Sequence, residues 1–127
     1  MFARFLHVES CGQCGACKFH SGGVSDTLER LERGAADDHD IEELGSHLRM
    51  VTDQNRCYLP VELQTVVASI LREYPDDFVA HLEGVRPPSR LYRLPKIVDM
   101  SDGTVAYDTR IAFKQPDWTY LEVRRAG

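Results

Sequence analysis

No stretch of this sequence has the composition of a membrane span or of a nucleic-acid-binding surface. Nowhere do eighteen apolar residues follow one another, so we expect no direct membrane insertion. Fifteen basic and twenty acidic side chains give a formal charge of −5, without any basic stripe, which disfavours nucleic acid as a partner. Arg4 and His7 interrupt the apolar start and no small-residue cleavage site follows. We interpret residues 1–8 as a mature terminus and expect a cytoplasmic protein.

Motifs of common catalytic sites are missing as well. The sequence has no G-x-G-x-x-G or other phosphate-binding glycine loop, no H-E-x-x-H motif and no G-x-S-x-G nucleophile elbow. The histidines are scattered, and His20, three residues after Cys17, is interpreted as a neighbour of a site or a solvent-facing residue. We therefore expect no catalytic residue and no small-molecule substrate of the chain's own.

Cysteine is scarce, but it is concentrated. The four cysteines follow the pattern C-x2-C-x2-C and then a fourth after 39 residues; they are Cys11, Cys14, Cys17 and Cys57. Disulfides are disfavoured, because nothing indicates secretion and cysteines three apart on a compact turn bridge poorly. Zinc remains an alternative, although structural zinc sites usually take two ligands from each of two C-x2-C hairpins. A 127-residue chain can build a modest core without obligatory cross-links. We therefore interpret the grouped cysteines first as a chemical site and not as structural cross-links.

The three-plus-one spacing favours a [4Fe-4S] cluster. Ferredoxin-like segments hold three corners of a cubane with a C-x2-C-x2-C run and take the fourth cysteine from elsewhere. Gly12 and Gly15 follow the first two cysteines, and we expect them to let the loop curl tightly by adopting unusual backbone angles. We expect four residues to surround the cluster without ligating it, with hydrogen bonds and charge that tune its reduction potential. They are Gly12, Gln13, Gly15 and Lys18.

Apolar residues recur at helical spacing over the first two thirds of the chain. The expected helices cover residues 1–9, a segment from 17 or 18 to a Gly34 cap, a segment capped by Asp37 or Asp38 that ends near 52–55, a helix from Pro60, and a short one capped by Asp76 that ends at Gly84. The sequence predicts a small all-α bundle over 1–84. One end of this bundle brings Cys57 back to the other cysteines, and a helix N-terminus faces the anionic cluster.

The character of the sequence changes after residue 84. Residues 85–95 form a proline-rich linker, and residues 96–127 form a β-hairpin and an aromatic tail. The Asp102-Gly103 pair predicts a two-residue hairpin turn, with Met100 opposite Val105 and Val98 opposite Tyr107. We expect this apolar face to pack on the bundle or on another protein, because a lone hairpin is marginal in water. In the extended tail, we expect a partner to be bound by Trp118 and Tyr120, unless they merely cover the bundle.

The segment from Phe5 to Lys18 includes the E-S-C-G-x-C-x-x-C core. With the distant fourth cysteine and the intervening Leu28–Gly34 segment, it resembles the iron–sulfur-binding region of the NADH-binding flavoprotein subunit of NADH:quinone oxidoreductase. Related regions occur in diaphorase subunits of hydrogenases and formate dehydrogenases. The resemblance covers about residues 1–84 and implies a four-helix bundle in which the four cysteines ligate a [4Fe-4S] cluster.

The sequence also departs from that family. The family usually has Pro before its third cysteine and Arg after it, where this chain has Ala16 and Lys18, and the segment 55–61 differs from the usual run of small residues. The flavin- and NADH-binding domain that precedes this region in the family is absent from the sequence. We therefore do not expect NADH oxidation.

The sequence supports two hypotheses of different kinds. In the first, the chain is a single-cluster electron-transfer protein or small subunit, which relays electrons between a flavoprotein or ferredoxin and a larger oxidoreductase. In the second, it is a structural or assembly subunit, whose cluster or zinc only stabilises the bundle while the C-terminal tail binds a partner. Neither hypothesis requires an enzyme on its own.

Overall fold

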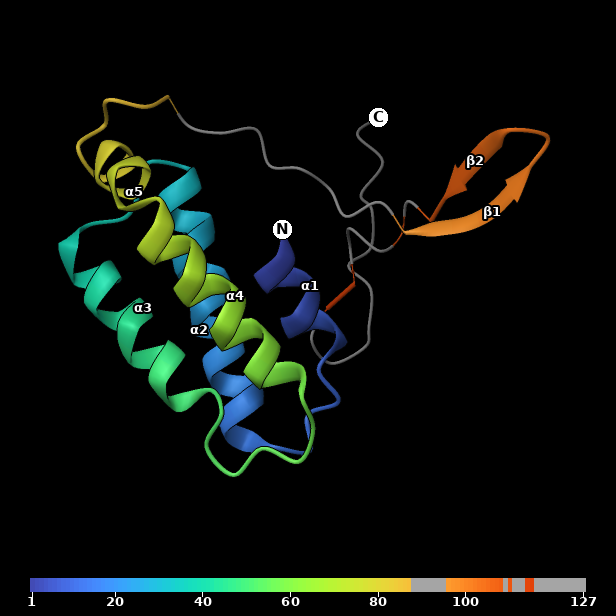
Figure 1. The fold of residues 1–127 in the computed structure, drawn as a ribbon, viewed down its shortest axis with the longest axis horizontal. Coiled ribbons are helices and arrows are strands. Elements are labelled where there is room, and N and C mark those ends of the chain that lie inside the picture. Colours follow the sequence, from blue (N-terminus) through green and yellow to red (C-terminus); the bar gives the residue numbers. More distant parts are fainter. Residues whose placement is uncertain (88–95, 109, 111–113, 116–127) are drawn as a thin grey trace, which may run out of the picture.

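The computed structural model describes residues 1–87, 96–108, 110 and 114–115. Within these residues the protein is mainly helical with one antiparallel hairpin, as the sequence predicted (Figure 1). No helix among them is long and apolar enough to span a bilayer. The helices are α1 (Phe2–Glu9), α2 (Gly15–Glu32), α3 (Asp38–Met50), α4 (Leu59–Glu73) and α5 (Pro75–Leu82), and the strands are β1 (Ile97–Ser101) and β2 (Thr104–Tyr107).

The core lies between α1, α2, α3 and α4, which each present one apolar stripe to it. The stripes expected in α3 and α4 supply Leu44 and Leu48 and then Leu63 and Val67 to it, while α5 contributes no buried side chain. At about 25 cal/mol per Å² of buried apolar surface, such stripes provide most of the stability of a small helical protein. The core residues are Ala3, Leu6, Val24, Leu44, Leu48, Val51, Leu63 and Val67.

Local signals set most helix ends. Asp37 caps α3, and its carboxylate and that of Asp40 each accept a hydrogen bond from the other residue's backbone N–H, which satisfies donors that the first turn leaves free. Gly34 takes the left-handed conformation after α2, with φ of 67°, as a helix-ending glycine does. The expectation that Asp76 caps α5 is wrong. The helix begins at Pro75 after the cap residue Tyr74, because the fixed φ of proline suits the first helical position.

Helix α2 is longer and more regular than the sequence suggests. It starts at Gly15, two residues before the predicted start, and continues through Gly22 and Gly23. Both glycines make room for rings from neighbouring helices. A Cβ on Gly22 would lie 3.0 Å from the His7 ring of α1, and one on Gly23 would lie 2.3 Å from the His47 ring of α3. The glycines that weaken the helix in isolation therefore let α1 and α3 approach it closely.

The hairpin has the predicted turn and a different register. Asp102 and Gly103 both have positive φ, as a two-residue turn of this kind requires. Met100 pairs with Val105 as predicted. The expected pairing of Val98 with Tyr107 is wrong, because an irregularity between Ile97 and Asp99 places Ile97 opposite Tyr107. Every residue of both strands is exposed, so the expected packing of this face on the bundle is absent from the part of the chain that the structure describes.

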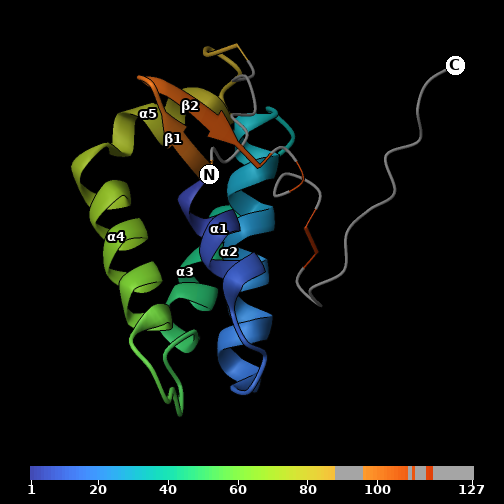
Figure 2. The ribbon, with the colours of Figure 1, turned by 90° about the vertical axis from the view of Figure 1, so that its right-hand side faces the viewer.

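The topology brings two distant connections to one end of the helices. The chain leaves α1 and enters α2 at the same end at which it passes from α3 to α4 (Figures 1 and 2). These two connections carry the cysteines, so residues about forty positions apart become neighbours.

Candidate metal centre

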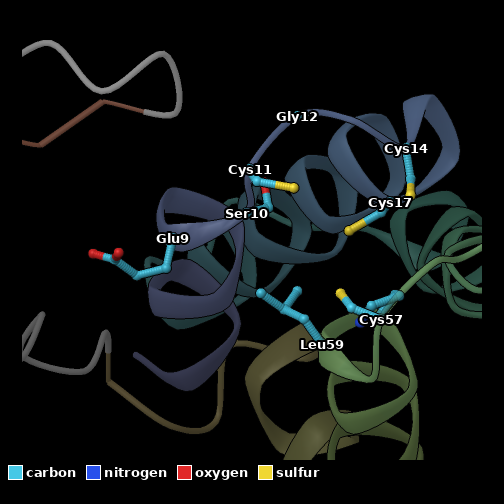
Figure 3. A pocket seen from close by; sticks show the side chains of 9 residues that line it. Glu9, Ser10, Cys11, Gly12, Cys14, Cys17, Cys57 and Leu59 are labelled. Atoms are coloured by element: carbon cyan, nitrogen blue, oxygen red, sulfur yellow. The ribbon is translucent and has the colours of Figure 1, made fainter.

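All four cysteines line one cavity at this end of the helices (Figure 3). Cys11 lies in the α1–α2 connection, Cys14 is the residue that precedes α2, and Cys17 lies in the first turn of α2. Cys57 comes from the α3–α4 connection. In Figure 3 the sulfurs of Cys11, Cys17 and Cys57 point into the space between the two connections. All four thiols are free.

The backbone between α1 and α2 curls around this space. Ser10 is extended (φ −61°, ψ 132°), Gly12 is left-handed with φ of 76°, and Cys14 is extended again before the helix begins (φ −105°, ψ 111°). Glycine is suited to the left-handed position because other residues pay a steric cost there. The prediction of unusual backbone angles is therefore confirmed for Gly12. It is wrong for Gly15, which is the first residue of α2 and has no positive φ.

The cavity suits a group larger than a single ion. Its volume is about 140 Å³, whereas a single water molecule requires about 10–15 Å³. Within the described ranges, no three His, Cys, Asp or Glu side chains converge tightly enough to hold one metal ion. Leu59 and Pro60 complete the lining with apolar surface. Four thiols around a space of this size form a donor set that fits a [4Fe-4S] cluster.

The thiols of the cavity influence one another electrostatically. Burial raises the pKa of Cys17 above that of an ordinary thiol, and the thiolates of Cys57, Cys14 and Cys11 raise it further, while Lys18 lowers it. Cys17 is buried, whereas Cys11 and Cys57 are exposed. Because a thiol must lose its proton to bind a metal, clustered thiolates of this kind are stabilised when metal cations neutralise them.

The residues that we expected around the cluster and at the partner-binding surface differ in how close they lie to the cavity. Gly12 lines the cavity, and Gln13 and Gly15 are exposed beside it. The amino end of α2 lies at the cavity, as expected, because Cys14 caps that helix. Lys18 lies in the first turn, and its ammonium group contacts the end of α1. The predicted partner-binding residues, Trp118 and Tyr120, lie outside the described residues.

Three features of the site are absent from the sequence prediction. Ser10 is almost fully buried, with 2% of its surface exposed, and it could have been noticed only as the residue between a helix end and the first cysteine. Phe19 and Tyr58 are 70% and 74% exposed beside the ligand-bearing segments. His20 Nδ1 of α2 lies 2.9 Å from His47 Nδ1 of α3, so the His20 imidazole is hydrogen-bonded to a neighbouring helix.

Comparison with known proteins agrees with this geometry. The profile of the NADH-ubiquinone oxidoreductase-F iron-sulfur binding region matches residues 1–81. The chain is 29% identical over 83 residues to the F subunit of NADH-quinone oxidoreductase in Mycobacterium bovis, and 30% identical over 84 residues to one of the F subunits of this enzyme in Rhizobium meliloti. It is 23% identical over 90 residues to the NADP-reducing hydrogenase subunit HndC of Solidesulfovibrio fructosivorans. These matches cover 65%, 66% and 71% of this chain but only 19%, 20% and 18% of the relatives.

Proposed function

Because the chain belongs to the family of the NADH-ubiquinone oxidoreductase-F iron-sulfur binding region, which binds a 4Fe-4S cluster, we propose that it is a single-cluster electron-transfer protein. It relays electrons between a flavoprotein or ferredoxin and a larger oxidoreductase, in the cytoplasm. The observation that carries this proposal is the convergence of four cysteines from two connections on one cavity.

The chain's own residues have distinct roles in this proposal. Cys11, Cys14, Cys17 and Cys57 are the four ligands, at one end of a bundle of the first four helices. A cluster ligated in this way supplies one-electron transfer without a change of ligands. Leu59 and Pro60 limit the access of water on one side, and the exposed Cys11 and Cys57 face the direction from which a redox partner can approach.

The partner proposal rests on the relatives and on the C-terminal residues. The relatives are named as subunits of a quinone oxidoreductase and a hydrogenase, which supports a larger redox enzyme as the partner of this chain. The family match ends at residue 81. We propose that residues 1–84 form the cluster-binding unit, that 85–95 link it, and that 96–127 dock to the partner.

The test is anaerobic purification of the full chain, followed by iron and acid-labile sulfide analysis and a potentiometric titration. About four irons and four sulfides per chain, with reversible reduction by one electron, support the proposal. Cys57→Ser should lower the iron content, whereas the adjacent Tyr58→Phe serves as a matched control and should not. One zinc ion without sulfide contradicts the proposal. A cluster that cannot be reduced without unfolding the protein favours the structural or assembly role instead.

A further inference from the structure

The ammonium group of Lys18 is fixed by three hydrogen bonds. Its Nζ donates to the Ser10 hydroxyl at 2.9 Å, to the Ser10 carbonyl at 3.1 Å and to the His7 carbonyl at 3.3 Å. The Ser10 hydroxyl in turn donates to the His7 carbonyl at 2.8 Å. The contact is partly buried, and Ser10 itself is almost fully buried, so bulk solvent and salt screen it only weakly.

These acceptors make the contact electrostatically favourable. The last carbonyls of a helix have no partner within the helix and carry partial negative charge. The His7 and Ser10 carbonyls are at this end of α1, and a lysine that donates to such groups stabilises the helix end. Lys18 therefore joins the carboxyl end of α1 to the amino end of α2.

The position of the contact in the chain gives it a second consequence. Ser10 directly precedes Cys11, and Lys18 directly follows Cys17. The hydrogen bonds between them close a ring that contains three of the four cysteines. The two ends of the cysteine loop are thus held together by one side chain, independently of any metal. A site whose ligands are already close loses less conformational entropy when it binds.

We propose that Lys18 is a positioning residue, which holds the loop from Ser10 to Cys17 in the shape that accepts the cluster. The inference rests on the proposed function, because it supposes that the three cysteines of the loop ligate a cluster. It assigns the lysine a role beyond its charge. Arginine, which has several donors on a long side chain, should retain much of this role, whereas methionine, which has none, should lose it.

The experiment compares four variants of the full chain after anaerobic reconstitution with iron and sulfide. Lys18→Met removes the contact, Lys18→Arg retains donors, and Ser10→Ala removes only the hydroxyl. Lys96→Met is the matched control, because Lys96 is exposed before the hairpin. The rate at which an iron chelator removes the cluster is measured by loss of its visible absorption, and far-UV circular dichroism of each metal-free variant records folding.

We expect Lys18→Met to lose its cluster roughly tenfold faster than the unmodified chain, at the lower end of the effects known for residues that orient metal ligands. Ser10→Ala should show a smaller increase, and Lys18→Arg should lie close to the unmodified chain, as should Lys96→Met. Rescue by arginine is the result that a loss of general stability would not give.

Equal rates for Lys18→Met and the unmodified chain overturn the inference and leave the proposed function intact. If Lys18→Met does not fold, Ser10→Ala decides, and an unchanged rate for that variant also overturns the inference. Failure of the unmodified chain to take up iron and sulfide would instead refute the proposed function.

Discussion

At the scale of single residues, the contact between α1 and α2 includes buried polar side chains. His7 is one of them, because its Nδ1 lies 2.9 Å from the Ser21 hydroxyl between α1 and α2. Burial lowers the pKa of His7 below its usual value, and the positive charges of Lys18 and Arg4 lower it further, although Asp26 opposes them. The folded state therefore favours the neutral imidazole.

This preference predicts a pH dependence of the metal-free protein. Above the ordinary histidine pKa of 6.5, His7 is neutral in both the folded and the unfolded chain. Its titration then does not change the free energy of unfolding. As pH falls below that value, the unfolded chain takes up a proton that the folded chain does not, so the free energy of unfolding decreases. Urea denaturation of the metal-free chain from about pH 7.5 to about pH 5 measures it.

The control for this prediction is a second imidazole. His7→Gln should weaken the dependence on pH, whereas substitution of the exposed His39 by Gln should leave it nearly unchanged. Equal slopes for the two variants would contradict the assignment to His7.

At the scale of helices, the close approach of α1 and α3 to α2 depends on adjacent glycines. Gly22→Ala should destabilise the protein, although alanine favours an isolated helix over glycine by about 1 kcal/mol. The added Cβ would lie 3.0 Å from the His7 ring, and this ring is buried and hydrogen-bonded, so it has little room to move. We expect a net loss of about 1–3 kcal/mol, as for other overpacked cores.

Urea denaturation of the metal-free variant measures this loss. Gly45→Ala in α3 is the matched control, because its Cβ would meet only the end of a flexible arginine at 3.4 Å; it should be neutral or stabilising. A gain of stability in Gly22→Ala would show that α1 can shift without cost.

The contrast between helices and hairpin shows how far sequence predicts this fold. Periodic apolar residues and the Asp37 cap predicted the existence of α3 and α4, because these signals are local. The role of Gly22 and Gly23 was not predictable in this way, since it depends on rings that belong to other helices. The hairpin turn was predicted from two residues, but the irregularity at Val98 has no local signal and shifted the register beyond it.

For the site, the cysteine spacing predicted which side chains gather, because four thiols in this pattern suit one kind of cluster. The pattern could not reveal how they are held together. The contact of Lys18 with Ser10 joins two helices, and a sequence does not show which backbone carbonyls an ammonium group will reach. The sequence therefore predicts a positive charge near the cluster at Lys18, but not its contact with α1.

At the scale of the whole molecule, the proposed cluster is a cross-link between the two halves of the helical region. Ligation of Cys17 and Cys57 closes a loop of about forty residues, which by the chain-entropy estimate for cross-links contributes about 4 kcal/mol to stability. This is a large share of the total for a domain of this size. We expect chelation of the cluster to lower the urea midpoint strongly and to make the chain susceptible to proteolysis.

Anaerobic urea titrations of the same preparation before and after chelation measure this difference. The metal-free Cys57→Ser variant, which has no cross-link to lose, is the control and should resemble the chelated chain. Coincident midpoints for the loaded and chelated protein would show that the helices hold together without the cross-link.

The unequal exposure of the four thiols determines which of them is oxidised first when the protein is exposed to air. Cys11 and Cys57 are exposed, one on each of the two connections, and Cys17 is buried. Oxidants in solution attack accessible thiolates first. We therefore expect oxidation to begin at the sulfurs of Cys11 and Cys57. A molecule oxidised at these two positions would no longer bind the metal, although the Cys17 thiol would still be reduced.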